Sequence, residues 1–220
     1  MHENTIIVVW EGVDAAGKTT LLEATSERLR SRGMLVEAYK TPSNTETGGF
    51  ATSRGNQPTT DPLTRMLLFL ANTSDDSAVI KKIIHEKRPD YMFLDRYYAC
   101  SIVYGFALIG RKLGKTMDDD KLLNFYRLIE EMGSDVFVKP DLTIVVEVDE
   151  QTRRRRVQQK HEGSDRSFEG DEMLQNLVRR YYAALLKNFD NSFVRVLNED
   201  SVVDRLSEEL AVKILSLRRV

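Results

Sequence analysis

Residues 12–20, Gly-Val-Asp-Ala-Ala-Gly-Lys-Thr-Thr, decide the fold of this 220-residue chain. They fit the phosphate-binding loop pattern, in which a glycine, four further residues and a second glycine are followed by Lys and Thr. The apolar run 6–10 before the loop is typical of a buried strand. Residues 20–32 after it have the apolar spacing of an amphipathic helix. Because a chance glycine loop with a solvated lysine lacks this context, we expect the loop to bind a nucleotide.

Each part of the loop has a task in binding phosphate. Gly12 and Gly17 let the backbone turn its N–H groups inward, and the start of the helix adds the positive end of its dipole. The Lys18 ammonium is expected to reach the β and γ phosphates, and the Thr19 hydroxyl to hold Mg²⁺. The residues expected to bind the nucleotide are Gly12, Val13, Asp14, Ala15, Ala16, Gly17, Lys18, Thr19 and Thr20.

Composition and charge narrow the class of protein. Apolar residues make up 41% of the chain and charged residues 30%, which is neither a disordered nor a membrane composition. The net charge of −2 argues against a general nucleic-acid-binding protein. We expect neither a nucleic-acid partner nor a membrane. Cys100 is the single cysteine, which excludes an intrachain disulfide and fits a reducing cytoplasm.

Strand-like runs alternate with helical stretches along the chain, and there is no internal repeat. This order predicts a parallel sheet covered on both faces, within a single domain over 1–220. After the first strand, the expected strands are 34–39, 91–94, 142–146 and 193–197.

The sequence also allows predictions for two polar segments and for the C-terminal tail. Residues 41–62 are rich in Ser, Thr, Asn and Gly, and we expect a long functional or mobile loop. Residues 160–170 are expected to form a flap. The tail 202–217 carries leucine and isoleucine on one helical face, which predicts packing on the sheet, with a partner helix as the alternative.

Asp95 and Arg96 directly follow the expected strand 91–94. Their side chains should therefore emerge at the carboxyl end of the strand, where open parallel sheets bind their ligands. There Asp95 can reach Mg²⁺ or its waters, and Arg96 can grip a phosphate at two points. A surface ion pair of little energetic value is the alternative.

Four consecutive arginines occupy 153–156. Since consecutive residues point in different directions around a helix, one or two of them can aim at a triphosphate, and the rest are expected to be solvated. Together with the polar segment that follows, they predict a cationic lid around 151–170 that excludes water and neutralises charge on a transferred phosphoryl group.

The chain resembles the thymidylate kinase family of P-loop nucleoside monophosphate kinases over nearly its whole length. The matching segments are 11–20, 95–97 with Tyr104, the Leu-Leu-Phe-Leu-Ala run at 67–71, and Asp165-Arg166 with Glu169. The resemblance implies a three-layer α/β P-loop kinase fold with a five-stranded parallel sheet flanked by helices. It implies transfer of the ATP γ-phosphoryl group to dTMP, giving dTDP and ADP, with Mg²⁺ as cofactor. We also expect a cytoplasmic homodimer.

The resemblance also assigns roles to single residues. Asp14 would approach the sugar 3′-hydroxyl and the metal region, and Arg96 would hold the monophosphate. Phe69 would stack on the thymine ring, with a core position as the alternative. Tyr104 would lie against the sugar or base, with a core tyrosine as the alternative. Because Ala15 stands where some members carry Arg, catalytic charge should come from the lid. The expected catalytic residues are Lys18, Asp14, Asp95, Arg96, Arg154 and Arg166, with Lys160 as a further lid candidate. The expected substrate-binding residues are Lys40, Phe69, Thr73, Arg96, Ser101 and Tyr104, and the expected metal ligands are Thr19 and Asp95.

Three positions depart from the family pattern. Lys40 replaces an Arg and loses its planar two-point grip. Thr73 stands where a base-binding Arg is usual, and Gly105 where a Gln is usual. The sequence therefore supports the type of reaction better than it supports the identity of the acceptor's base. Arg65 and Asn72 are candidates to replace the missing contact with the base. Another nucleoside monophosphate kinase, a deoxynucleoside kinase and a nucleotide-dependent switch remain the alternatives.

Overall fold

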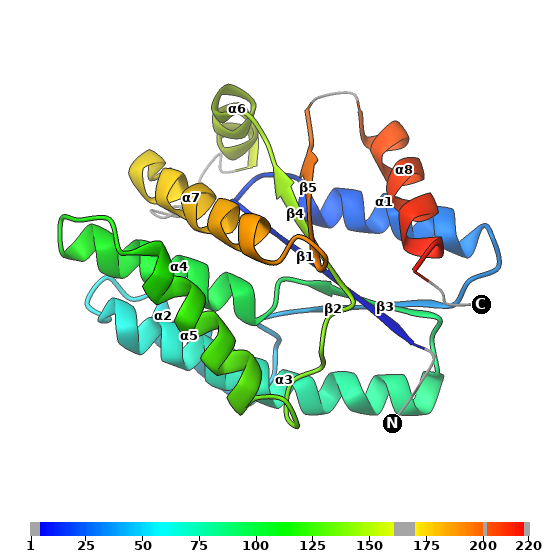
Figure 1. Ribbon diagram of the computed structural model, residues 1–220, viewed down its shortest axis with the longest axis horizontal. Coiled ribbons are helices and arrows are strands. Elements are labelled where there is room, and N and C mark those ends of the chain that lie inside the picture. The colour runs from blue at the N-terminus through cyan, green and yellow to red at the C-terminus, as the bar shows by residue number, and fades with distance from the viewer. Residues whose placement is uncertain (1–4, 161–169, 200–201, 218–220) are drawn as a thin grey trace.

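Five parallel strands in the order β2-β3-β1-β4-β5 form the centre of the molecule, in a computed structural model that describes residues 5–160, 170–199 and 202–217 (Figure 1). This arrangement confirms the predicted sheet, with strand ends that differ from the prediction by at most two residues. The strands are β1 (Ile6–Gly12), β2 (Val36–Lys40), β3 (Tyr91–Asp95), β4 (Leu142–Glu147) and β5 (Phe193–Leu197).

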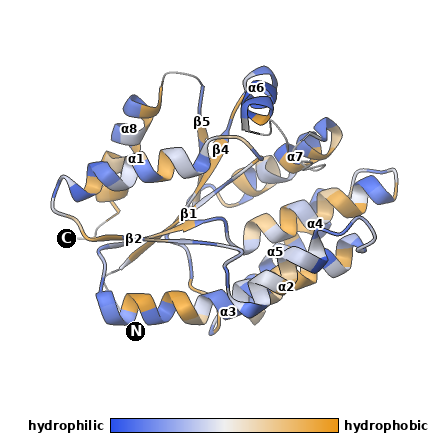
Figure 2. Cartoon of the chain, turned by 180° about the vertical axis from the view of Figure 1, so that it is seen from behind, coloured by the Kyte–Doolittle hydropathy of each residue, from blue (hydrophilic) through white to orange (hydrophobic). Residues whose placement is uncertain are grey.

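Helices cover both faces of the sheet (Figure 1). Helices α1 and α8 pack together on one face, while α4 and α7 pack against β1 on the other, with α3 beside α4. In Figure 2 most helices carry both orange and blue residues, whereas α6 is largely blue. The helices are α1 (Lys18–Arg30), α2 (Glu46–Gly55), α3 (Pro62–Lys87), α4 (Tyr98–Lys112), α5 (Asp119–Met132), α6 (Glu150–Lys160), α7 (Glu172–Asn188) and α8 (Val203–Leu215).

The register of β1 positions the site. Val8, Val9 and Trp10 are buried to within 1% exposure, as a strand covered on both faces requires. Trp10 pairs with Asp95 of β3, and the last residue of β1, Gly12, pairs with Val146 of β4. The carboxyl ends of three neighbouring strands therefore meet where the phosphate loop begins.

The expected long loop at 41–62 contains a helix, so this prediction is wrong in part. Helix α2 begins after Thr45, whose Oγ1 accepts a hydrogen bond from the Gly48 N–H at 3.2 Å. The sequence Glu-Thr-Gly-Gly-Phe-Ala-Thr-Ser-Arg-Gly has poor helix propensity because of its three glycines. Capping and packing against α3 compensate for it.

The tail forms α8 as predicted, with Leu206, Leu210 and Ile214 buried on one face. Helix α1 is its main neighbour, and its buried side chains belong to the same hydrophobic core as the strands, which agrees with the predicted packing on the sheet. None of the helices within the described ranges is both long and apolar enough to cross a bilayer.

Candidate active site at the phosphate loop

Two glycines allow the phosphate loop to take its shape. Gly12 has φ +133°, and a Cβ on it would lie 2.1 Å from the Val146 carbonyl oxygen. Gly17 has φ +83°, and a Cβ there would lie 2.4 Å from Asn198 Nδ2. An L side chain at either position would be strained and would collide with its neighbour. The loop is thus packed against β4 and the segment after β5.

Lys18 lies at the first position of α1, folded back over the loop. Its Nζ donates to the carbonyl oxygens of Gly12 at 3.2 Å and Val13 at 2.7 Å. Burial, together with the nearby Arg96 charge, lowers the pKa of Lys18 to about 8. The ammonium therefore remains mostly charged at neutral pH and is partly dehydrated, which strengthens its attraction for phosphate.

Thr19 and Asp95 meet beside Lys18. The Thr19 hydroxyl donates to Asp95 Oδ2 at 2.7 Å, which joins the start of α1 to the end of β3. A hydroxyl and a carboxylate are hard oxygen donors of the kind that Mg²⁺ prefers. Both residues line the same cavity as Lys18. Their oxygen atoms and their position therefore fit the predicted role of Thr19 and Asp95 as metal ligands.

Arg96 is fixed in an unusual backbone conformation with φ +70°. Its N–H donates to the Trp10 carbonyl oxygen at 3.0 Å, and its own carbonyl accepts from Thr41 Oγ1 at 3.0 Å. A non-glycine residue at positive φ is held against a steric cost, which is often seen at functional sites. These bonds from β1 and the segment after β2 set the direction of the side chain.

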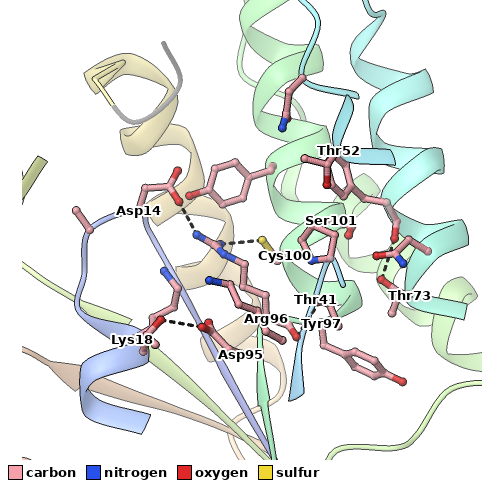
Figure 3. Close-up of a pocket in the computed structure, with 18 of the residues that line it drawn as sticks. Asp14, Lys18, Thr41, Thr52, Thr73, Asp95, Arg96, Tyr97, Cys100 and Ser101 are labelled. Atoms are coloured by element: carbon pink, nitrogen blue, oxygen red, sulfur yellow. Dashed lines mark hydrogen bonds and ion pairs between the residues drawn. The ribbon is translucent and has the colours of Figure 1, made fainter. Parts of the chain in front are cut away.

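The Arg96 guanidinium points into the cavity (Figure 3). It is ion-paired with Asp14 of the phosphate loop and donates to Cys100 Sγ at 2.9 Å. It also lies 5.5 Å from the centroid of the Tyr104 ring. Burial alone would raise the pKa of Asp14, but the charges of Arg96 and Lys18 outweigh it and lower the pKa to about 2. The site is therefore organised around a charged Asp14 between two cations.

Sequence reasoning missed Gln175, which α7 places against Asp14. Gln175 Nε2 donates to Asp14 Oδ2 at 3.1 Å, and its Oε1 accepts from the Asp14 N–H at 3.2 Å. The two residues are 161 positions apart. Nothing in the local pattern of α7 distinguishes Gln175 from an ordinary polar helix residue, so only the packing of α7 reveals this contact.

A cavity of about 670 Å³ connects the phosphate loop with α2, α3 and α4 (Figure 3). Phe69 is half-buried and lines it, so its predicted core alternative does not hold. All predicted substrate-binding residues line this one cavity: Lys40, Phe69, Thr73, Arg96, Ser101 and Tyr104. The structure brings them together, and their individual roles stay predictions.

The arginines of α6 divide between two surroundings. Arg154 is 54% exposed, pairs with Glu150 at 3.1 Å and with Glu172, and is not among the residues that line the cavity. Arg156 instead donates to the carbonyl oxygens of Ala16 at 3.2 Å and Asn198 at 3.1 Å, and it lines the cavity. The catalytic role of Arg154 stays a prediction. Arg166 lies outside the described residues, and the position of the Lys160 side chain is likewise not described.

Glu11 is a second residue that sequence reasoning left without a role. Its carboxylate is fully buried and accepts from the N–H groups of Tyr97 at 3.0 Å and Cys100 at 3.2 Å, and from the Tyr182 hydroxyl at 2.7 Å. It therefore caps the first turn of α4 from β1 and ties both to α7. Burial outweighs these hydrogen bonds and the Arg96 charge, and raises the pKa of Glu11 to about 7.

The raised pKa predicts a pH-dependent contribution of Glu11 to stability. Between its ordinary pKa of 4.5 and about 7, the folded state holds a proton that the unfolded state has released. The free energy of unfolding should therefore fall as pH rises through this window, by roughly 3 kcal/mol from this group. Urea unfolding of the wild type and Glu11→Gln at pH 5, 6, 7 and 8 measures it. The free energy of unfolding of the wild type minus that of Glu11→Gln should fall as pH rises to about 7 and then level off, and a pH-independent difference would contradict the assignment.

A strand that leads into a glycine-rich phosphate loop, with Lys18 and a second cation, Arg96, in the same cavity, is typical of nucleotide-binding phosphotransferases of the P-loop class. A sequence model of the family described as thymidylate kinase matches residues 10–209. The chain belongs to the thymidylate kinase family, whose members are ATP-dependent nucleoside monophosphate kinases that phosphorylate dTMP. This confirms the resemblance found in the sequence.

Individual relatives agree with the family match. A probable thymidylate kinase of Sulfurisphaera tokodaii is 29% identical, and the match covers 96% of both chains. One of Archaeoglobus fulgidus is 27% identical over 93% of this chain and 92% of the relative. Among solved structures, thymidylate kinase of Candida albicans matches with a TM-score of 0.71 at 22% identity, over 97% of this chain and 92% of that one. This last likeness supports the fold.

Proposed function

We propose that this chain carries the ATP triphosphate on its phosphate loop and the acceptor's monophosphate on Arg96. The observation that carries the proposal is the placement of the Lys18 and Arg96 cations in one cavity, with Asp14 between them. An acceptor phosphate at Arg96 would face the γ-phosphate at Lys18. Holding the two groups together in this way supplies much of the catalysis of phosphoryl transfer, since little covalent help from protein is needed.

Thr19 and Asp95 would hold Mg²⁺, as their oxygen donors and their position beside Lys18 suggest. Bound Mg²⁺ supplies charge neutralisation at the β and γ phosphates. Asp95 is assigned to the metal rather than to proton abstraction, because the acceptor phosphate is already anionic at neutral pH. Phe69 would stack on the base, and Asp14, oriented by Gln175, would approach the 3′-hydroxyl of the sugar.

A panel of acceptors tests the function directly. We expect ADP release from Mg-ATP to depend on an added monophosphate and to have its highest kcat/KM with dTMP, among dTMP, dUMP, dCMP, dGMP and UMP. Thymidine serves as the control acceptor, because a deoxynucleoside kinase would prefer the free nucleoside. Preference for CMP or UMP would place the chain with another monophosphate specificity, and ADP release that ignores acceptors would support a nucleotide-dependent switch.

We further propose that the protein is a cytoplasmic homodimer. We also propose that residues 1–220 form one kinase domain, with a lid around 151–170. Apolar side chains on α2 and α3 support self-association, since Phe50, Leu63 and Leu67 are 59%, 48% and 51% exposed. Light scattering coupled to size-exclusion chromatography measures the mass in solution.

A further inference from the structure

Asp14 joins the phosphate loop to the second cation of the site. It is ion-paired with Arg96, whose Nη2 donates to Asp14 Oδ1 (Figure 3). The backbone bonds of Arg96 fix the point at which its side chain leaves the end of β3, and the ion pair fixes where the guanidinium ends. The direction of the Asp14 carboxylate therefore decides where Arg96 can meet an acceptor's phosphate.

Gln175 of α7 bonds both the backbone and the side chain of Asp14. Its Nε2 donates to Asp14 Oδ2 at 3.1 Å, and its Oε1 accepts from the Asp14 N–H at 3.2 Å. Because an ionised carboxylate only accepts hydrogen bonds and a backbone N–H only donates them, these two partners determine the orientation of the amide. One side-chain amide thus holds Asp14 at two points.

Helix α7 keeps this amide in a fixed position. Gln175 lies in the first turn of the helix and is fully buried, as are Leu174 and Val178 on the same face. Asp171 caps the turn by accepting from the Leu174 N–H at 2.9 Å, and it pairs with Arg111 of α4 at 2.7 Å. A polar group on a buried and capped helix is positioned more precisely than one on a loop. The position of α7 is therefore passed on to the phosphate loop through Gln175.

The charges of the site favour a neutral amide at this position. Burial alone would raise the pKa of Asp14, but Arg96 and Lys18 lower it to about 2, so the carboxylate is ionised. A cation in place of Gln175 would compete with Arg96 for Asp14, and a second carboxylate would repel it. The amide adds two hydrogen bonds and leaves the net charge of the site unchanged.

We propose that Gln175 is a positioning residue for phosphoryl transfer, whose neutral amide holds Asp14, and through it Arg96, in the geometry that binds the acceptor's phosphate. A displacement of about 1 Å in a group that positions a substrate can cost about 100-fold in rate, so this indirect role can have a large effect. The inference rests on the proposed function, because it takes the acceptor's phosphate to lie at Arg96.

The first test asks whether Gln175 acts through Arg96. Gln175→Met keeps an unbranched side chain of similar length and removes both hydrogen bonds to Asp14. We expect it to lower kcat/KM for dTMP by about 10- to 100-fold. In the Arg96→Ala background, the same change should cost less than about threefold, because the group that Gln175 positions is then missing. A glutamine that only packs α7 on the loop would cost the same factor in both backgrounds.

The second test makes the contact titratable. In Gln175→Glu, the protonated carboxyl offers the same donor and acceptor as the amide, whereas the ionised carboxylate repels Asp14. The Tyr104 hydroxyl, 3.5 Å from Gln175 Oε1, also faces this position, and burial holds its pKa well above the usual value, so it stays neutral. We expect kcat/KM for dTMP, divided by that of the wild type at the same pH, to fall at least about tenfold between pH 5.5 and 8.5.

Controls separate positioning from folding. The same ratio for Gln175→Met should not change with pH, and melting temperatures at each pH show that the assayed proteins are folded. Asn176→Met is the matched control, because Asn176 is the next residue of α7, is exposed and does not line the cavity. Its kcat/KM for dTMP should equal that of the wild type. Calorimetric titration with dTMP in the absence of ATP adds a binding readout that does not depend on turnover, and Gln175→Met should weaken this binding.

The outcomes distinguish this inference from the proposed function. Equal losses for Gln175→Met in the two backgrounds would overturn the inference, as would a Gln175→Glu ratio that does not change with pH. The pH comparison is made within one variant, so it decides the question if the methionine variant is unstable. A wild-type protein that fails to phosphorylate dTMP would instead reject the proposed function.

Discussion

Replacement of Lys18 with alanine is expected to abolish phosphoryl transfer while the fold survives. The Lys18 ammonium bonds two carbonyl oxygens of its own loop, so its removal takes away a preorganised cation more than core packing. Losing such a cation costs about 3 kcal/mol or more of transition-state stabilisation, which corresponds to at least about a 100-fold fall in kcat. Steady-state assays with dTMP and Mg-ATP measure the fall, and thermal melting followed by circular dichroism checks the fold.

Lys82→Ala is the matched control for this experiment. Lys82 lies on α3 with a 71% exposed side chain, so its removal changes the net charge equally without touching the cavity. Its turnover should stay close to that of the wild type. Near-normal turnover of Lys18→Ala with intact ATP binding would reject the assignment of the phosphate loop.

The sheet could be predicted from the sequence because short stretches of neighbouring residues are enough to indicate each strand. The three central strands β1, β3 and β4 are short, mostly apolar runs, and residues 12–20 combine a strand end with glycines whose positive φ the structure requires. Asp95 and Arg96 were placed correctly for the same reason, since a residue after a parallel strand emerges at the ligand-binding edge. In these cases neighbouring residues alone determine the position.

The remaining features depend on contacts between distant segments. Helix α2 was missed because its stability comes from packing on α3 rather than from its glycine-rich sequence. The contact of Gln175 with Asp14 depends on how α7 lies across β1. Similarly, the rotation of α6 about its axis decides that Arg156, and not Arg154, faces the loop. A run of four arginines does not contain this information.

Arg96→Ala is expected to raise the KM for dTMP far more than the KM for ATP. The proposed role of Arg96 is to grip the acceptor's phosphate, and a charge-assisted bidentate contact of this kind is worth a rise of about 10- to 100-fold in KM. The ATP phosphates are assigned to Lys18 and the loop, so the KM for ATP should change by less than about threefold. Initial rates measured over a grid of dTMP and Mg-ATP concentrations separate the two constants.

Arg96→Lys separates the effect of the planar guanidinium group from the effect of its positive charge. A lysine at this position keeps a positive charge beside Asp14 and so preserves the ion pair with the phosphate loop. It cannot, however, bind a phosphate through two parallel N–H donors as a guanidinium does. We therefore expect Arg96→Lys to keep the wild-type melting temperature more closely than Arg96→Ala, and to recover only part of the affinity for dTMP. If both Michaelis constants rose equally in Arg96→Ala, or only that for ATP, then Arg96 would serve the phosphate loop through Asp14 and would not hold the acceptor.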